Sequence, residues 1–228
     1  STPTPAIDET LAPYRAPASY EDNAPPQLER LQQRNAQTCG TLLHQILQRI
    51  CEQGTEHWDK QRVEHMSSVW EKQLLSAGIN QPHSLNFAHS IVTAVNACIN
   101  DQIGRWILDR NHQYSACELE ILAPEARQLT NGAYCQSSYI IDRTFVDQGI
   151  RWIIDYKSSQ PSTEQSLAEF LAQETEEYIS QLQTYTELMR ELDPAHPVKT
   201  ALFFPMIQHL EEVTLIKSEQ KANLDRLT

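Results

Sequence analysis

Residues 139–157, with the sequence YIIDRTFVDQGIRWIIDYK, decide how the rest of this chain is interpreted. The apolar and β-branched residues predict two strands, and Asp-Gln-Gly at 147–149 predicts a tight turn between them. The first strand carries Asp142. The second carries Asp155 and Lys157, which leave one face because they are two residues apart. Two carboxylates and an amine at the edge of a small sheet suit a divalent cation and the chemistry of phosphodiester hydrolysis.

The composition is that of a globular protein with reduced thiols. The chain has 228 residues, 40% of them hydrophobic, which is enough for one domain with a core and additional helices. No run reaches the roughly 20 apolar residues of a membrane span and no signal peptide is evident, so we expect a cytoplasmic protein without a membrane partner. The chain starts at Ser1, which suggests a fragment of a longer polypeptide. Its cysteines are odd in number and lack C-x-x-C spacing, as is typical of free thiols: Cys39, Cys51, Cys98, Cys117 and Cys135.

The net charge of −12 has the wrong sign for a protein that holds nucleic acid by general electrostatics. Two explanations would reconcile this charge with a nucleic-acid substrate. A metal site concentrates carboxylates but becomes locally cationic once it is loaded. A fragment can also use the basic surface of its parent chain.

The chain divides by composition and by hydrophobic period. Residues 1–26 hold six of the 12 prolines and have the composition of a linker. We expect one domain over 27–228, with a helical part at about 27–112 and a catalytic α/β core at about 113–218. The helical part contains three predicted helices, which form an N-terminal platform: one through Leu43, Ile46, Leu47 and Ile50 that ends at Gly54, one at about 59–77 that ends at Gly78, and one from about 84 to 108.

From about residue 114 the period changes to that of strands. Ser162-Thr-Glu-Gln165 has the form of a capping box and predicts a helix to about 192, ended by Asp193-Pro194. The predicted strands lie at 117–122, about 135–146, 150–158, 198–204 and 212–216. The order β-β-β-α-β-β predicts an α/β (α+β) fold with a mixed central sheet flanked by helices.

Each candidate site residue also has a structural interpretation. A lone acid-x-Lys motif, with Asp or Glu as the acid, is weak, because Glu219-Gln-Lys221 matches it as well as Asp155-Tyr-Lys157 does. Only Asp155 follows an apolar run, at 152–154. Strand-end acids such as Asp142 often pair with a neighbouring arginine. His44 lies one turn after Gly40, on a face where another segment could approach closely. Beside leucines, such a histidine is more often a hydrogen-bonded residue at the edge of the core. Gln181 and Tyr185 share one helix face, which an ordinary surface would also explain.

In this order, the motifs resemble the nuclease domain of the RecB and AddA type, within the PD-(D/E)XK superfamily. The matching pieces are Gly40-Thr-Leu-Leu-His44, Cys117-Glu118-Leu-Glu120, Ile141-Asp142-Arg143, Ile154-Asp155-Tyr156-Lys157 and Gln181-Leu-Gln-Thr-Tyr185. They span residues 40 to 185, and Ala201-Leu-Phe-Phe-Pro205 is similar to the next strand of the family. The resemblance implies a restriction-endonuclease-like core.

The resemblance also implies a role for each matching residue. His44, Asp142, Asp155 and the backbone carbonyl of Tyr156 would bind the metal, and Lys157 would position or activate the attacking water. A strand glutamate would complete the catalytic set, and we favour Glu118 over Glu120, although both leave the same face of a regular strand. Contacts to DNA are expected from Gln181, Tyr185 and Arg143.

The expected cofactor is Mg²⁺ or Mn²⁺, which prefer carboxylate oxygens and also accept imidazole. An iron–sulfur cluster, present in some relatives, is not expected because no cysteine follows Cys135. The resemblance implies an exonuclease V-like DNA nuclease that acts on single-stranded ends in double-strand-break repair and recombination. Its partners would be the UvrD/Rep-like helicase domains of the parent chain and a second helicase-nuclease subunit. Two alternatives remain open: a nuclease-like DNA-binding or assembly module without catalysis, and a free-standing exonuclease or restriction-type enzyme.

Overall fold

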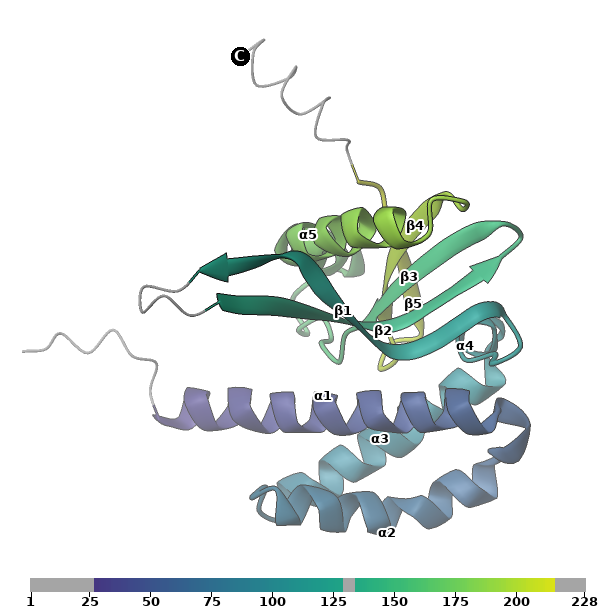
Figure 1. Ribbon diagram of the computed structural model, residues 1–228. Helices are drawn as coiled ribbons and strands as arrows, with labels where there is room; N and C mark the ends of the chain where they lie inside the picture. Colours follow the sequence, from purple (N-terminus) through teal and green to yellow (C-terminus); the bar gives the residue numbers. More distant parts are fainter. Residues whose placement is uncertain (1–26, 129–133, 216–228) are drawn as a thin grey trace, which may run out of the picture.

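The computed structural model describes residues 27–128 and 134–215, so the predicted linker at 1–26 lies outside the described residues. A five-stranded sheet is covered on one side by the N-terminal helices and on the other by a single long helix (Figure 1). The domain limits given above stay a prediction. Within the described ranges, no helix combines the length and the apolar character needed to cross a bilayer.

The helical layer begins with α1 (Gln27–Gln53), which ends at Gly54, in the left-handed region with a φ of 94°. A short 3-10 helix, η1 (Thr55–His57), leads to α2 (Lys60–Ser76). The Asp59 carboxylate caps α2 by accepting the amide of Arg62 at 2.7 Å. Both ends were predicted from these residues.

The third predicted helix is two helices, α3 (His83–Asn100) and α4 (Gln102–Ile107). Asp101 breaks the run because it adopts an extended conformation and its carboxylate accepts the amides of Ile103 and Gly104. Gly104 then packs directly on the backbone of Cys98, where a Cβ atom would overlap the Cys98 carbonyl oxygen. A continuous helix over 84–108 was therefore wrong.

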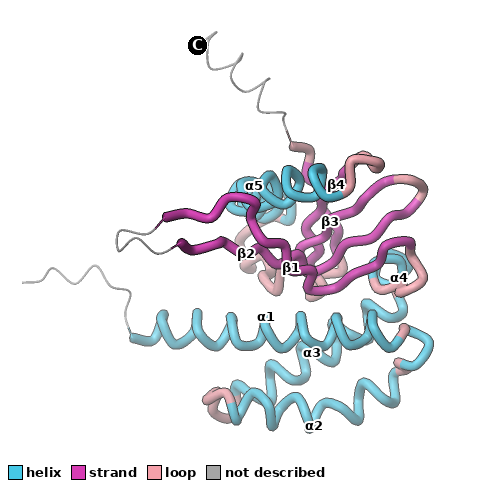
Figure 2. The backbone as a smooth tube through the Cα atoms, viewed as in Figure 1, coloured by secondary structure: helices cyan, strands magenta, loops and turns pink. Residues whose placement is uncertain are grey.

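The sheet is mixed, as predicted, and its strands follow one another in chain order. Figure 2 shows the strands, in magenta, between the N-terminal helices and α5, in cyan. Among the described strands, only the β3–β4 pair is parallel, and α5 (Leu167–Leu192) is the crossover between these two strands. The β1–β2, β2–β3 and β4–β5 pairs are antiparallel. The strands are β1 (Gln113–Gln128), β2 (Tyr134–Asp147), β3 (Ile150–Tyr156), β4 (Val198–Phe204) and β5 (His209–Val213).

Several boundaries differ from the prediction. Strand β1 covers 113–128 and not only 117–122, and β5 begins at His209, before residue 212. The capping box of α5 is formed by Ser166 and Glu169, so the helix begins later than Ser162. Strand β5 ends at Val213, before residue 216. The predicted end of α5 is confirmed, with Asp193 as its last cap.

Two apolar cores lie on opposite sides of the sheet. One joins the helical layer to the sheet and includes Leu43, Leu47 and Phe145, all with 0% exposure. The other joins the sheet to α5 and includes Ile141 and Leu182. Strands β3 and β4 are therefore buried on both faces, between the helical layer and α5.

Candidate metal centre

The β2–β3 hairpin opens where its two acids lie. The last pair in the ladder is Arg143 with Ile154, so Asp142 and Asp155 are at the next level, in the middle of β2 and near the end of β3. Beyond the last ladder pair, the backbone amide of Tyr156 donates to the side chain of Asp142, at 2.7 Å from its Oδ2 atom, in place of a carbonyl oxygen of β2. This bond fixes the acid at the point where the strands separate.

At the level of Asp142, the side chains of β1 and β2 no longer alternate regularly between the two faces of the sheet. Cys117 packs with the helix-side core, whereas Leu119 packs with the α5-side core. Glu118, between them, has a φ of 50°, which costs a non-glycine residue roughly 1–3 kcal/mol. The register places Glu118 opposite Asp142. The strained conformation therefore brings a second carboxylate to the opening of the hairpin.

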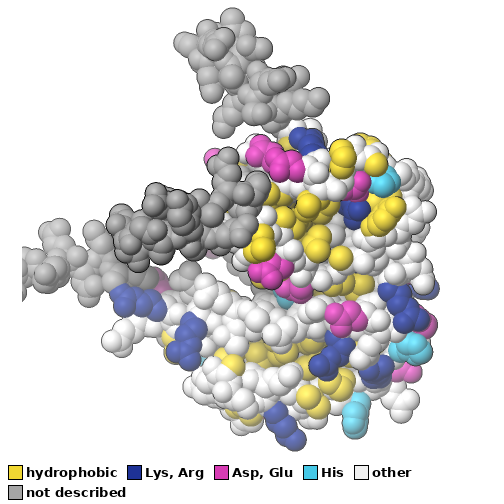
Figure 3. Space-filling model, in the orientation of Figure 1, with side chains coloured by type: hydrophobic (Ala, Val, Ile, Leu, Met, Phe, Trp, Pro, Cys, Tyr) yellow, Lys and Arg dark blue, Asp and Glu magenta, His cyan; other side chains and the backbone are white. Residues whose placement is uncertain are grey.

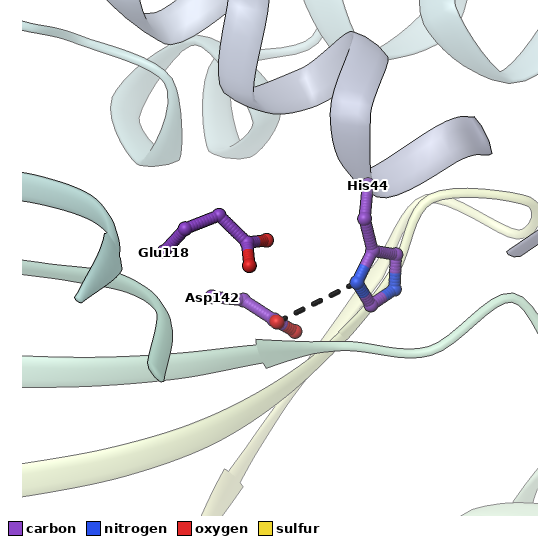
Figure 4. A group of neighbouring side chains, drawn as sticks. All are labelled: His44, Glu118 and Asp142. Carbon is purple, nitrogen blue, oxygen red and sulfur yellow. Dashed lines mark ion pairs between the residues drawn. The ribbon is translucent and has the colours of Figure 1, made fainter. Parts of the chain in front are cut away.

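Helix α1 supplies an imidazole to these two acids. His44, Glu118 and Asp142 each offer one ligand atom, and these atoms lie within 4.8 Å of one another (Figure 4). The Nδ1 atom of His44 lies 3.5 Å from Oδ1 of Asp142. The ring of His44 packs edge-on against Tyr156, with 5.6 Å between centroids, which orients the imidazole. Three elements thus converge on one cluster.

Gly40 brings the loop after β3 close to α1. A Cβ atom at Gly40 would lie 2.7 Å from the hydroxyl oxygen of Ser158. The close approach predicted at this glycine is thus made by the segment that immediately follows Lys157.

Asp155 lies beside the three-residue cluster and is held from the other side. Its Oδ2 atom pairs with Lys157 Nζ at 2.6 Å, and its Oδ1 atom accepts the Gln181 amide at 3.1 Å. The Asp155 side chain is only 5% exposed. Oδ1 therefore accepts a hydrogen bond, whereas the buried Oδ2 has the ion pair with Lys157 but no hydrogen bond, and the carboxylate lies in a buried environment next to Asp142.

The charges of the cluster are poorly compensated within the protein. Burial, followed by the negative charge of Asp142, raises the pKa of Asp155 to about 6 and also raises the pKa of Glu118. Burial alone would lower the pKa of His44, but Asp142 and the other two acids outweigh it and raise that pKa. A bound cation would relieve this repulsion, and one imidazole with carboxylate oxygens is a donor set suited to Mg²⁺ or Mn²⁺. The side chains of this cluster therefore fit a Mg²⁺ or Mn²⁺ ion.

The geometry distinguishes between the two candidate strand glutamates, Glu118 and Glu120. Glu118 belongs to the cluster, whereas Glu120 is exposed on β1 and lies outside the cluster. The assumption that both leave the same face fails because the left-handed conformation of Glu118 interrupts the alternation. The catalytic role of Glu118 stays a prediction.

The prediction that Arg143 contacts DNA is wrong. Its side chain has 0% exposure, and its guanidinium donates to the carbonyl oxygens of Ile107, Asp109 and Ala116. Arg143 instead ties β2 to the helical layer, which keeps the hairpin in place below His44.

Helix α5 carries more site contacts than the sequence indicated. The phenol of Tyr185 donates to the carbonyl oxygen of Ile140 at 2.7 Å and accepts the amide of Gln181 at 2.6 Å. Since Tyr185 is 5% exposed, we assign it to supporting the site and not to DNA contact. Tyr178, which the sequence analysis missed, lies over Lys157, with Nζ 3.3 Å from the ring centroid. Its spacing of three from Gln181 and seven from Tyr185 was the available signal.

A comparison with protein families agrees with this geometry. The family model described as "PD-(D/E)XK nuclease superfamily" matches residues 10–227 of the chain. No curated protein matches the chain.

Proposed function

The chain belongs to the PD-(D/E)XK nuclease superfamily, and from this membership we propose that it is a Mg²⁺- or Mn²⁺-dependent deoxyribonuclease that digests the ends of single-stranded DNA. The observation that carries the proposal is the convergence of His44, Glu118 and Asp142 on one point, with Asp155 and Lys157 beside it. Such a centre combines a cation site with an amine that can face the attacked phosphate.

The metal would be held by His44, Glu118, Asp142 and Asp155, with the Tyr156 carbonyl as a further predicted ligand. When bound, the ion supplies Lewis-acid polarisation of the scissile phosphate and favours ionisation of a water molecule. The protein supports this by fixing the donors: Tyr156 N–H holds Asp142, and Gln181 holds Asp155. A preorganised donor set has little reorganisation to undergo when the charge of the transition state develops.

Lys157 contributes a positive charge at the reacting phosphate. Its ammonium is 2.6 Å from Asp155 and its side chain is 14% exposed, so it is held in one position and is shielded from bulk water. In that position it can donate to a phosphate oxygen or to the attacking water. The direct contact of Gln181 with DNA stays part of the proposal, because that residue is partly exposed.

The cellular context that we propose is a helicase-nuclease active in double-strand-break repair and recombination. Its support is the set of ordered motifs from Gly40 to Tyr185, which resembles the RecB and AddA type. In this setting helicase domains of the parent chain and a second subunit would deliver single-stranded ends. Their surfaces would add to the few basic side chains of this chain, which in the view of Figure 3 lie mainly over the helical layer.

The test is hydrolysis of linear single-stranded DNA with Mg²⁺, with Mn²⁺ and with a chelator. We expect cleavage only when metal is present, and we expect Asp155→Ala to abolish it. Glu120→Gln is the matched control, since that acid is outside the cluster. Activity that persists in the chelator or in Asp155→Ala contradicts the catalytic assignment. Mn²⁺ binding without any cleavage would instead indicate a binding module.

A further inference from the structure

Helix α5 contacts every second residue of the segment that starts at Asp155. Gln181 donates to Asp155, the ring of Tyr178 covers Lys157, and Glu174 accepts the hydroxyl of Ser159 at 2.8 Å. One face of a helix repeats every three to four residues, and one face of an extended segment repeats every two. The spacing of the three helix residues therefore matches the spacing of the three residues that they contact. One face of α5 thus lies along the extended segment that contains Asp155 and Lys157.

The Lys157 ammonium lies between an acid and an aromatic ring. Nζ is 2.6 Å from Oδ2 of Asp155 and 3.3 Å from the centroid of the Tyr178 ring. A cation over a ring face at this distance is attracted by the ring quadrupole, more strongly when it is removed from water. The two contacts restrain the last bonds of a side chain that otherwise has large conformational freedom.

We infer that Tyr178 is a positioning residue, whose ring holds the ammonium of Lys157 against Asp155 and so directs it toward the attacked phosphate. The inference rests on the proposed function for the role of Lys157 in hydrolysis, but the positioning itself is a property of the folded chain. The ring face carries this role, and the hydroxyl does not.

The environment of Tyr178 agrees with a role for its ring. Burial and a hydrogen bond with Glu177 raise the pKa of the Tyr178 phenol to about 12, so the residue is neutral at physiological pH. The attraction to Lys157 therefore does not come from a phenolate. A phenylalanine would keep the ring face that contacts Lys157 and would lose only the hydroxyl.

A packing role and a positioning role make different predictions for substitutions at Tyr178. Leucine and methionine keep apolar bulk without a ring, and phenylalanine keeps the ring. We expect the kcat of Tyr178→Leu to fall about tenfold with KM little changed, the size of one desolvated cation–π contact. Tyr178→Phe should retain nearly full activity. Tyr114→Leu is the matched control, because that ring covers Arg151 away from the site.

A second readout does not depend on activity. The full chain is treated with a limiting amine-acylating reagent, and the modification of Lys157 is measured by peptide mass spectrometry. We expect Lys157 to be acylated several-fold faster in Tyr178→Leu and Tyr178→Met than in the unsubstituted chain, and unchanged in Tyr178→Phe. If Tyr178→Leu does not fold, Tyr178→Met serves in both assays.

The outcomes separate the two proposals. Equal behaviour of the leucine and phenylalanine variants, or of the leucine variant and the unsubstituted chain, overturns the positioning role. An unsubstituted chain that does not cleave DNA, but in which the ring still controls Lys157 acylation, overturns the nuclease proposal and leaves the positioning role intact.

Discussion

The Nδ1 atom of His44 on α1 lies 3.5 Å from Oδ1 of Asp142 on β2, which joins two adjacent layers of the fold. The contact joins the helical layer to the β2–β3 hairpin, which carries Asp142 and Asp155. Without it, the helical layer would only cover the sheet. With it, the helix contributes a nitrogen donor to a carboxylate site and completes a cluster suited to a divalent cation.

Glu118→Gln and Glu120→Gln form a matched pair on one strand. We expect the first to lower Mn²⁺ affinity and nuclease activity by at least about tenfold, because it removes a charged donor from the cluster. The second should have no effect, since Glu120 is exposed outside the cluster. Calorimetric titration with Mn²⁺ and single-strand cleavage assays measure both variants. Equal losses in the two variants would contradict the assignment of Glu118.

His44→Ala should weaken Mn²⁺ binding by at least about tenfold, the lower bound for residues that support a metal ligand. The free energy of unfolding without metal is measured in parallel, because the variant also loses the packing of the ring against Tyr156. His89→Ala, at an exposed position on α3, is the control. An unchanged Mn²⁺ affinity in His44→Ala would show that the imidazole is no ligand.

The raised pKa of Asp155 predicts how metal affinity depends on pH. The folded carboxyl has a pKa of about 6, against an ordinary 3.8, so between these values the folded state binds a proton that the unfolded state has released. The free energy of unfolding without metal should therefore fall as pH rises through this window. A metal needs the carboxylate, so Mn²⁺ affinity should decrease below about pH 6, by up to about tenfold per pH unit.

Asp155→Asn should remove this component of the pH dependence. Mn²⁺ titrations at several pH values between about 5 and 8 measure it. A pH profile identical to that of the unsubstituted chain would mean that Asp155 is not the titrating group.

Gly104→Ala tests the break between α3 and α4. The added methyl group would overlap the carbonyl of Cys98, a backbone atom that cannot rotate away, so the free energy of unfolding should fall by about 2 kcal/mol or more. Gly40→Ala is the matched control, because its neighbour is the Ser158 hydroxyl, which can change rotamer. It should lie within about 1 kcal/mol of the unsubstituted chain. Denaturant unfolding measures both, and equal losses would contradict the packing described for Gly104.

Arg143→Met tests the structural role assigned to this arginine. It removes the guanidinium donor from four carbonyl oxygens, those of Ile107, Asp109, Ala116 and Thr144, which should lower the free energy of unfolding by about 3 kcal/mol. DNA affinity of the folded fraction, and its dependence on salt, should not change. A reduced salt dependence with normal stability would restore Arg143 as a phosphate contact.

Local chemistry made much of the fold predictable. Gly54, Asp59 and the Asp147–Gly149 turn each have a conformational preference that tertiary contacts do not oppose, and the structure uses them as predicted. Two boundaries failed where a better local partner was available: Asp101 broke a helix that its apolar period continued, and Ser166 had a glutamate three residues on. Both signals are present in the sequence but compete with equally plausible neighbours.

The sequence predicted which residues belong to the site better than it predicted how they are arranged. Asp142, Asp155 and His44 were identified from motif and order, but a strand period of two cannot show that the side-chain alternation of β1 is interrupted at Glu118. The burial of Arg143 and the contact of Tyr178 with Lys157 depend on how layers pack, which no local pattern contains. The errors therefore concern what each side chain contacts across the layers.

The most direct test of a metal centre at the opening of the hairpin is anomalous diffraction from a crystal soaked in Mn²⁺. We predict a manganese peak among His44 Nδ1 and the carboxylates of Glu118 and Asp142, with Asp155 at its side, and its loss in Glu118→Gln. A soaked crystal with no peak at this position, or with manganese only elsewhere on the chain, would contradict the proposed centre.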